Sequence, residues 1–179
     1  PKFIKTLLKE FNPSAISINL FRYHSLKHPP LSQKLIDDYK KTVDTYKKFL
    51  FKGYLTHYGF FGAKILKIKE ILQKELIYNV AKFNKFVTPC TAGNLSYVIM
   101  EDGSLKPCEI LSDNLGKITN KKDFSIRKLF LSKKAKNLRS WIVKTKCKCT
   151  YECAMSTNTL FTWPMIKKWA KKLPEEILK

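Results

Sequence analysis

Three of the five cysteines in this chain fall within seven residues, in the stretch CKCTYEC, at positions Cys147, Cys149 and Cys153. The other two, Cys90 and Cys108, lie in the same half of the sequence. Thiolates are soft ligands, and four of them suit a tetrahedral zinc ion or an iron–sulfur cluster. The two distant cysteines would close long loops on one metal centre, so metal binding is expected to stabilise the fold.

The cysteine spacing alone does not decide between zinc and iron. A zinc ribbon normally carries two Cys-x-x-Cys pairs, and this sequence has none. The alternative, that the cysteines are simply small buried hydrophobic residues, is disfavoured because all five are concentrated after residue 89. Their odd number, in a chain that opens without a signal-peptide pattern, argues against a disulfide framework. We therefore expect a soluble protein in the reducing cytoplasm.

The composition supports a folded core but does not by itself identify the class of binding partner. The chain has 179 residues, 44% of them hydrophobic and 13% aromatic. Its formal net charge of +21 suggests nucleic acid or an anionic membrane. However, only Arg22, Arg127 and Arg139 among the 35 basic residues are arginines, and phosphate and base recognition favour the planar arginine fork. We expect nucleic acid not to be the main partner, and the apolar runs are too short to span a membrane.

Hydrophobic periodicity predicts the elements of the first half. Residues 2–10 read as a short helix, and the alternating stretch at 14–23 reads as a strand. Ser32 is expected to cap a helix whose apolar stripe runs from Ile36 to Leu50. A second long helix follows, with its buried stripe predicted at Ile65, Ile68, Leu72, Leu76, Val80 and Phe83. Both stripes are expected to need a sheet to cover them.

The second half reads differently. Residues 95–108 predict a β-hairpin around an Asp102–Gly103 turn, which brings Cys108 back toward Cys90. Residues 125–145 are predicted to be helical with a break near Ser132, and a short amphipathic helix is expected to end the chain.

Two motifs resemble a known family. CTAGNLSYVIMEDGSLKPCEILSDNLGKI, which begins at Cys90, is similar to the start of the auxiliary-cluster domain of radical SAM enzymes, of the SPASM or twitch type. CKCTYECAMSTNTLF resembles the closing cysteine run of one subgroup. The resemblance covers residues 85–162 and departs from the SPASM pattern, which has more cysteines after the gap. It therefore implies one auxiliary four-iron four-sulfur cluster and not two.

The resemblance also implies a domain order and a fold class. Residues 1–86 would be the C-terminal part of a radical SAM partial barrel, with 14–23 as a late barrel strand. Residues 87–162 would form the SPASM/twitch domain, and 163–179 a C-terminal helix. The implied fold class is α/β, or α+β overall, with a partial TIM-like barrel followed by a small cysteine-rich domain.

A central family motif is absent from this sequence. Radical SAM enzymes bind their catalytic cluster with Cys-x-x-x-Cys-x-x-Cys, and this chain has no such run. We expect the chain to be a C-terminal fragment of an oxidoreductase or maturase, with the missing N-terminal half of the barrel as its partner. The full-length enzyme would use S-adenosylmethionine and a second cluster on an unknown peptide or small molecule. The alternative is a structural zinc module that binds a protein or nucleic acid.

The candidate ligands follow from these motifs. Cys90, Cys108, Cys149 and Cys153 form the preferred set, and Cys147 can replace Cys149. The backbone amides of Ala92 and Gly93 are candidate donors to cluster sulfides, although Gly93 suits a turn equally well.

Two polar residues are candidates for a second role. Asn19 and Arg22 lie toward the carboxyl end of the predicted strand, which faces the active site in barrel enzymes. Arg22 would bind a carboxylate of S-adenosylmethionine or of substrate, and its alternative role is a surface salt bridge.

Overall fold

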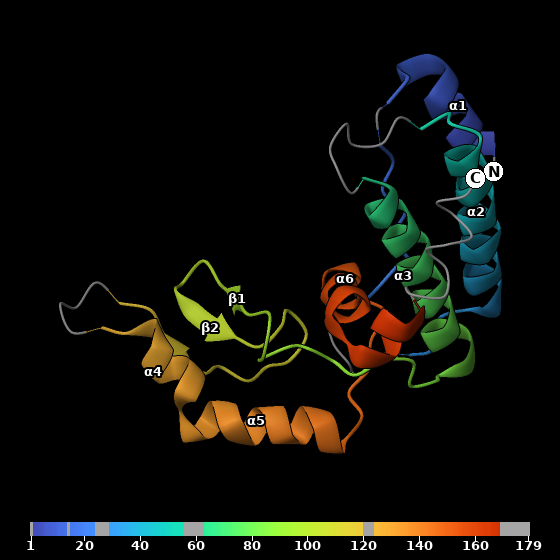
Figure 1. Ribbon diagram of the computed structural model, residues 1–179. Helices are drawn as coiled ribbons and strands as arrows, with labels where there is room; N and C mark the ends of the chain where they lie inside the picture. Colours follow the sequence, from blue (N-terminus) through green and yellow to red (C-terminus); the bar gives the residue numbers. More distant parts are fainter. Residues whose placement is uncertain (1, 14, 24–28, 56–62, 120–123, 169–179) are drawn as a thin grey trace.

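Helices dominate the chain, as Figure 1 shows, and the buried hydrophobic residues of its described part form three clusters. The computed structural model describes residues 2–13, 15–23, 29–55, 63–119 and 124–168. Its elements, in chain order, are α1 (Lys2–Phe11), α2 (Gln33–Phe51), α3 (Ala63–Phe83), β1 (Val98–Ile99), β2 (Ser104–Lys106), β3 (Gly116–Lys117), α4 (Ile126–Leu131), α5 (Lys133–Lys144) and α6 (Glu152–Phe161). The fold is therefore helix-rich α+β, with one small antiparallel sheet.

The first core, which we call the helical unit, is built on α2 and α3 and holds two of these clusters. The predicted stripe of α2 is confirmed, because Ile36, Tyr39, Val43, Tyr46 and Leu50 are all buried. On α3 the middle of the predicted stripe is buried, but Ile65 and Phe83 are 42% and 60% exposed. These two residues lie in the first and last turns of α3, at the ends of its packed surface.

The stripes of α2 and α3 are covered by helix and not by a sheet, contrary to expectation. Met155 from α6 and Met165 beyond it pack in one core with Tyr39, Val43 and Leu72. Residues 163–168 are helical, as predicted for the chain end, and residues 169–179 lie outside the described residues. The chain therefore returns to the helical unit after the cysteine run.

The strand predicted at 14–23 does not form in the described residues 15–23. The alternation is real, since Ile16, Ile18 and Leu20 turn inward, but no neighbouring strand is described beside this extended segment. Side chains bind its carbonyl groups instead. Lys74 Nζ donates to Ile18 O at 3.0 Å, and the Tyr151 hydroxyl donates to Tyr23 O.

The second core, the sheet unit, holds the predicted hairpin. Strands β1 and β2 pair antiparallel, with Val98 opposite Lys106, and β3 extends the sheet on the other edge of β2. At the turn Gly103 has φ of 80°, where a side chain is disfavoured. The buried face packs on α5, with Leu105, Leu111, Leu115, Ala135, Leu138 and Ile142 in one core.

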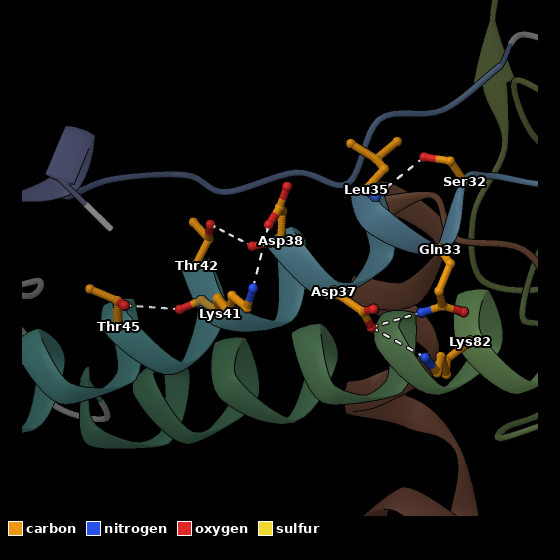
Figure 2. Close-up of polar contacts among 9 residues, drawn as sticks. All are labelled: Ser32, Gln33, Leu35, Asp37, Asp38, Lys41, Thr42, Thr45 and Lys82. Carbon is orange, nitrogen blue, oxygen red and sulfur yellow. Dashed lines mark hydrogen bonds and ion pairs between the residues drawn. The ribbon is translucent and has the colours of Figure 1, made fainter.

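Helix boundaries in both units follow their capping residues. The break predicted near Ser132 is confirmed, because this residue separates α4 from α5 and its Oγ accepts from Ala135 N at 3.1 Å. At the start of α2, Ser32 Oγ accepts from Leu35 N at 3.3 Å (Figure 2). Among the described residues, no helix combines the length and the apolar character that a membrane crossing requires.

The first turn of α2 is also fixed to α3. Asp37 Oδ1 accepts from Gln33 Nε2 at 2.7 Å and from Lys82 Nζ at 3.2 Å, as Figure 2 shows. These contacts lower the pKa of Asp37, the Gln33 hydrogen bond more than Lys82. The charge pair is exposed, so we expect it to align the two helices more than to stabilise them.

Loss of the Ser32 cap tests the boundary of α2. Ser32→Ala leaves the Leu35 amide without its side-chain acceptor and should lower the free energy of unfolding by about 1 kcal/mol. Urea unfolding followed by circular dichroism measures it. Ser112→Ala, at an exposed loop serine, is the matched control and should change little. Equal stability of the two variants would contradict this account of the helix start.

Candidate metal centre and adjoining cavity

Four of the five cysteines lie in or next to the segments that connect the helical unit to the sheet unit. Cys90 is in the connection that leaves α3 for the sheet, whereas Cys108 lies inside the sheet unit, two residues past β2. Cys147 and Cys149 are in the short link between α5 and α6, and Cys153 is in the first turn of α6. All five are free thiols, four of them half-buried and Cys153 exposed. Sequence positions far apart therefore meet at one junction.

Buried polar contacts hold the connection that carries Cys90 against α6. Asn158 Oδ1 on α6 accepts from both the backbone N and the Oγ1 of Thr91, each at 2.8 Å. Thr88 Oγ1 and Thr162 Oγ1 lie 2.7 Å apart in a second buried hydrogen bond. These contacts fix the backbone on both sides of Cys90 against the helix that carries Cys153.

The Cys90 and Cys147 thiols shift each other's pKa in opposite directions. Contact with the Cys147 side chain lowers the pKa of Cys90 to about 6, against an opposing effect of burial. Contact with Cys90 is the main cause that raises the pKa of Cys147.

The remaining thiols are held neutral by burial and by each other. Burial raises the pKa of Cys149 to about 12, and negative charge on Cys90, Cys108 or Cys153 would raise it further. Burial is also the main cause of the raised pKa values of Cys108 and Cys153. The sulfurs are therefore close enough for each to respond to the charge of others. A cation bound among them would relieve this repulsion.

Backbone amides point at several of the sulfurs. Leu111 N donates to Cys108 Sγ at 3.4 Å. The amides of Ala92, Tyr151 and Ala154 lower the pKa values of the cysteines at 90, 149 and 153 through hydrogen bonds. N–H donors of this kind stabilise thiolates and tune the potential of an iron–sulfur cluster.

The two amides singled out in the sequence have different partners. Ala92 N donates to the Cys90 sulfur itself. Gly93 N donates to Ser96 O at 2.9 Å, and Gly93 has φ of 73°. Gly93 therefore serves the turn that follows Cys90, the second of its two predicted roles.

The spacing of the thiols bears on the kind of metal. Within the described part of the chain, no three His, Cys, Asp or Glu side chains are arranged to hold a metal ion. Zinc–sulfur bonds are about 2.3 Å long, so a single ion needs its ligands close together. A multi-iron cluster is larger and its ligands stand further apart. The donor set, four or five thiols with amide donors to their sulfurs, has the chemistry of a cluster site.

A cavity of about 540 Å³ adjoins the junction. Cys149 contributes to its wall, together with Lys148 and Tyr151 from the same link and Arg22 from the extended segment. The Arg22 guanidinium carbon lies 4.3 Å from the centroid of the Tyr151 ring. Helical-unit residues such as Val80 complete the wall.

The structure separates the two polar candidates of the extended segment. Arg22 lines the cavity, whereas Asn19 is exposed, accepts from Ser17 Oγ at 3.3 Å and is not among the described residues of the cavity wall. Sequence analysis missed Tyr151, Lys148 and Asn158. The position of Lys148 and Tyr151 within the cysteine run was the available signal for the first two.

No family model, curated protein or solved structure matches this chain. The class defined here is therefore a structural one, a helix-rich α+β protein with five thiols at the junction of two cores.

The Asn158 contacts can be tested by substitution. Asn158→Ala leaves the buried Thr91 amide and hydroxyl without an acceptor, so the free energy of unfolding should fall by about 1–3 kcal/mol. Asn137→Ala, on the exposed face of α5, is the matched control and should change little. Urea unfolding measures both, and a loss no larger than the control would show that the junction does not depend on Asn158.

Proposed function

We propose that this chain is the C-terminal portion of a radical SAM enzyme and binds one auxiliary four-iron four-sulfur cluster. The observation that carries the proposal is that five free thiols, distant in sequence, lie near enough to shift one another's pKa values. When bound, such a cluster supplies one-electron chemistry or holds substrate beside the reacting centre. Free thiols of this kind suit the reducing cytoplasm.

The hairpin supports the family assignment. Cys90 and Cys108 flank the paired strands, with Ile99 opposite Leu105, and both cysteines pack against the core of the sheet unit. Burial of Leu105 in that core fixes the register, because a slip of one residue would turn it outward. The family motif relies on the same hairpin to bring its first two cysteines together.

The position of Cys149 favours one ligand set. Cys149 lines the cavity, whereas Cys147 is not among the described residues of the cavity wall. We therefore assign Cys90, Cys108, Cys149 and Cys153 as ligands, with Cys147 outside the ligand set.

The alternative, a structural zinc module, has less support. Among the described residues no three side chains are arranged to hold a metal ion, which counts against either kind of centre, so the preference rests on the cysteine pattern. The paired Cys-x-x-Cys pattern of zinc ribbons is also absent.

Iron binding by cysteine variants tests the assignment. After anaerobic reconstitution the chain should be brown and hold about four iron atoms. Replacing any of the four assigned ligands with Ser should remove most of the iron. Cys147→Ser is the matched control and should keep it, because Cys147 lies outside the assigned ligand set. A colourless protein with stoichiometric zinc would refute the cluster, and iron loss in Cys147→Ser would refute the ligand set.

The missing catalytic motif gives a separate expectation. Without Cys-x-x-x-Cys-x-x-Cys, the 179-residue chain should not cleave S-adenosylmethionine, even when reconstituted and supplied with reductant. Chromatography for 5′-deoxyadenosine measures this, with a radical SAM enzyme that has the motif as positive control. Product above the protein-free background would contradict the proposal that the catalytic cluster is bound outside this chain.

A further inference from the structure

We propose that the cavity beside Cys149 binds a small organic anion with a flat apolar body. The inference goes beyond the proposed function, because binding in the cavity requires no iron. The cavity volume of about 540 Å³ is within the range of small-molecule sites, about 300–1,000 Å³. It is large enough for a compound of one or two rings with an anionic group.

The charge of the wall selects for an anion. Arg22 and Lys148 both line the cavity, and no Asp or Glu is among the described residues of its wall. Lys148 Nζ donates to Asn84 O, which holds its ammonium group at the edge of the cavity. Two cations without a carboxylate in a half-enclosed space favour a negatively charged occupant.

Arg22 is positioned to provide the specific contact. Its guanidinium lies over the Tyr151 ring, and the Tyr151 hydroxyl is itself fixed by its bond to Tyr23 O. Among the residues that the structure describes, no oxygen atom accepts a hydrogen bond from this guanidinium. Glu152 senses its charge only weakly, and Glu152 Oε2 accepts from Gln73 Nε2 at 2.6 Å. The Arg22 guanidinium is thus oriented, half-buried and available to bind two oxygen atoms of an anionic group in bidentate fashion.

The rest of the wall suits an apolar ring. Phe21, Leu31, Val80 and Ile110 line the cavity from three separate segments of the chain. The Phe21 ring meets the Tyr23 ring edge to face, with centroids 5.2 Å apart. Side chains of this kind favour flat, poorly hydrated groups. An occupant would lie with its body on this surface and its anionic group at Arg22.

The test uses four probes and the full 179-residue chain. Saturation-transfer NMR compares 3-phenylpropionate with its neutral analogue 3-phenylpropanamide, its cationic analogue phenethylamine, and phenyl phosphate. We expect both anions to bind and the amide and the amine to bind at least about 10-fold more weakly, because each lacks the charge-assisted contact. The stronger anion identifies carboxylate or phosphate as the preferred group.

Arginine variants locate the site. Arg22→Gln should weaken binding of the anions about 10-fold and leave the amide unchanged, whereas Arg22→Lys should lose less. Arg127→Gln, at an exposed arginine on α4, is the matched control and should bind as the parent chain does. Equal binding of acid and amide, or equal losses in the two Gln variants, would overturn the inference. The visible absorbance of each variant, recorded separately, reports on the cluster and keeps the two proposals independent.

Discussion

The return of the chain to the helical unit after the cysteine run is the constraint on which the junction depends. α6 packs on α3, and Met155 and Met165 complete a core that α2 and α3 alone would leave open. That packing carries Asn158 to the connection beside Cys90, where its amide oxygen accepts two hydrogen bonds from Thr91. Without it, the sheet unit would be linked to the helices only by peptide chain, and no fixed geometry would bring the thiols together.

Crowding of the thiols then sets the chemistry of the junction. Burial raises the pKa values of Cys108, Cys149 and Cys153, whereas contacts with Cys147 and the Ala92 amide lower the pKa of Cys90. A metal would bind in competition with the protons that burial favours, so its affinity is expected to rise with pH.

Local signals predicted much of the fold and less of the site. The stripe of α2, the Ser32 cap, the break at Ser132 and the hairpin each depend on contacts between near neighbours in sequence. The strand predicted at 14–23 was wrong because alternating apolar residues indicate that one face is buried but do not indicate a neighbouring strand. Side chains such as Lys74 donate hydrogen bonds to the carbonyl groups of this segment instead. That the cysteines share one site stays a prediction from their spacing. The cavity was not predictable, since Arg22 meets Tyr151 only through tertiary packing.

The link between α5 and α6 serves two sites with very few residues. Cys149 belongs to the thiol group, while Lys148 and Tyr151, one and two positions away, form part of the cavity wall. If both proposed sites are occupied, a shift of this peptide that suits one site would alter the other, and the two binding free energies would be coupled. Such coupling is reciprocal: an anion that favours one charge state of a bound centre is itself held more tightly in that state. Through this link, occupancy of the cavity would change the electron affinity of a centre bound at the thiols.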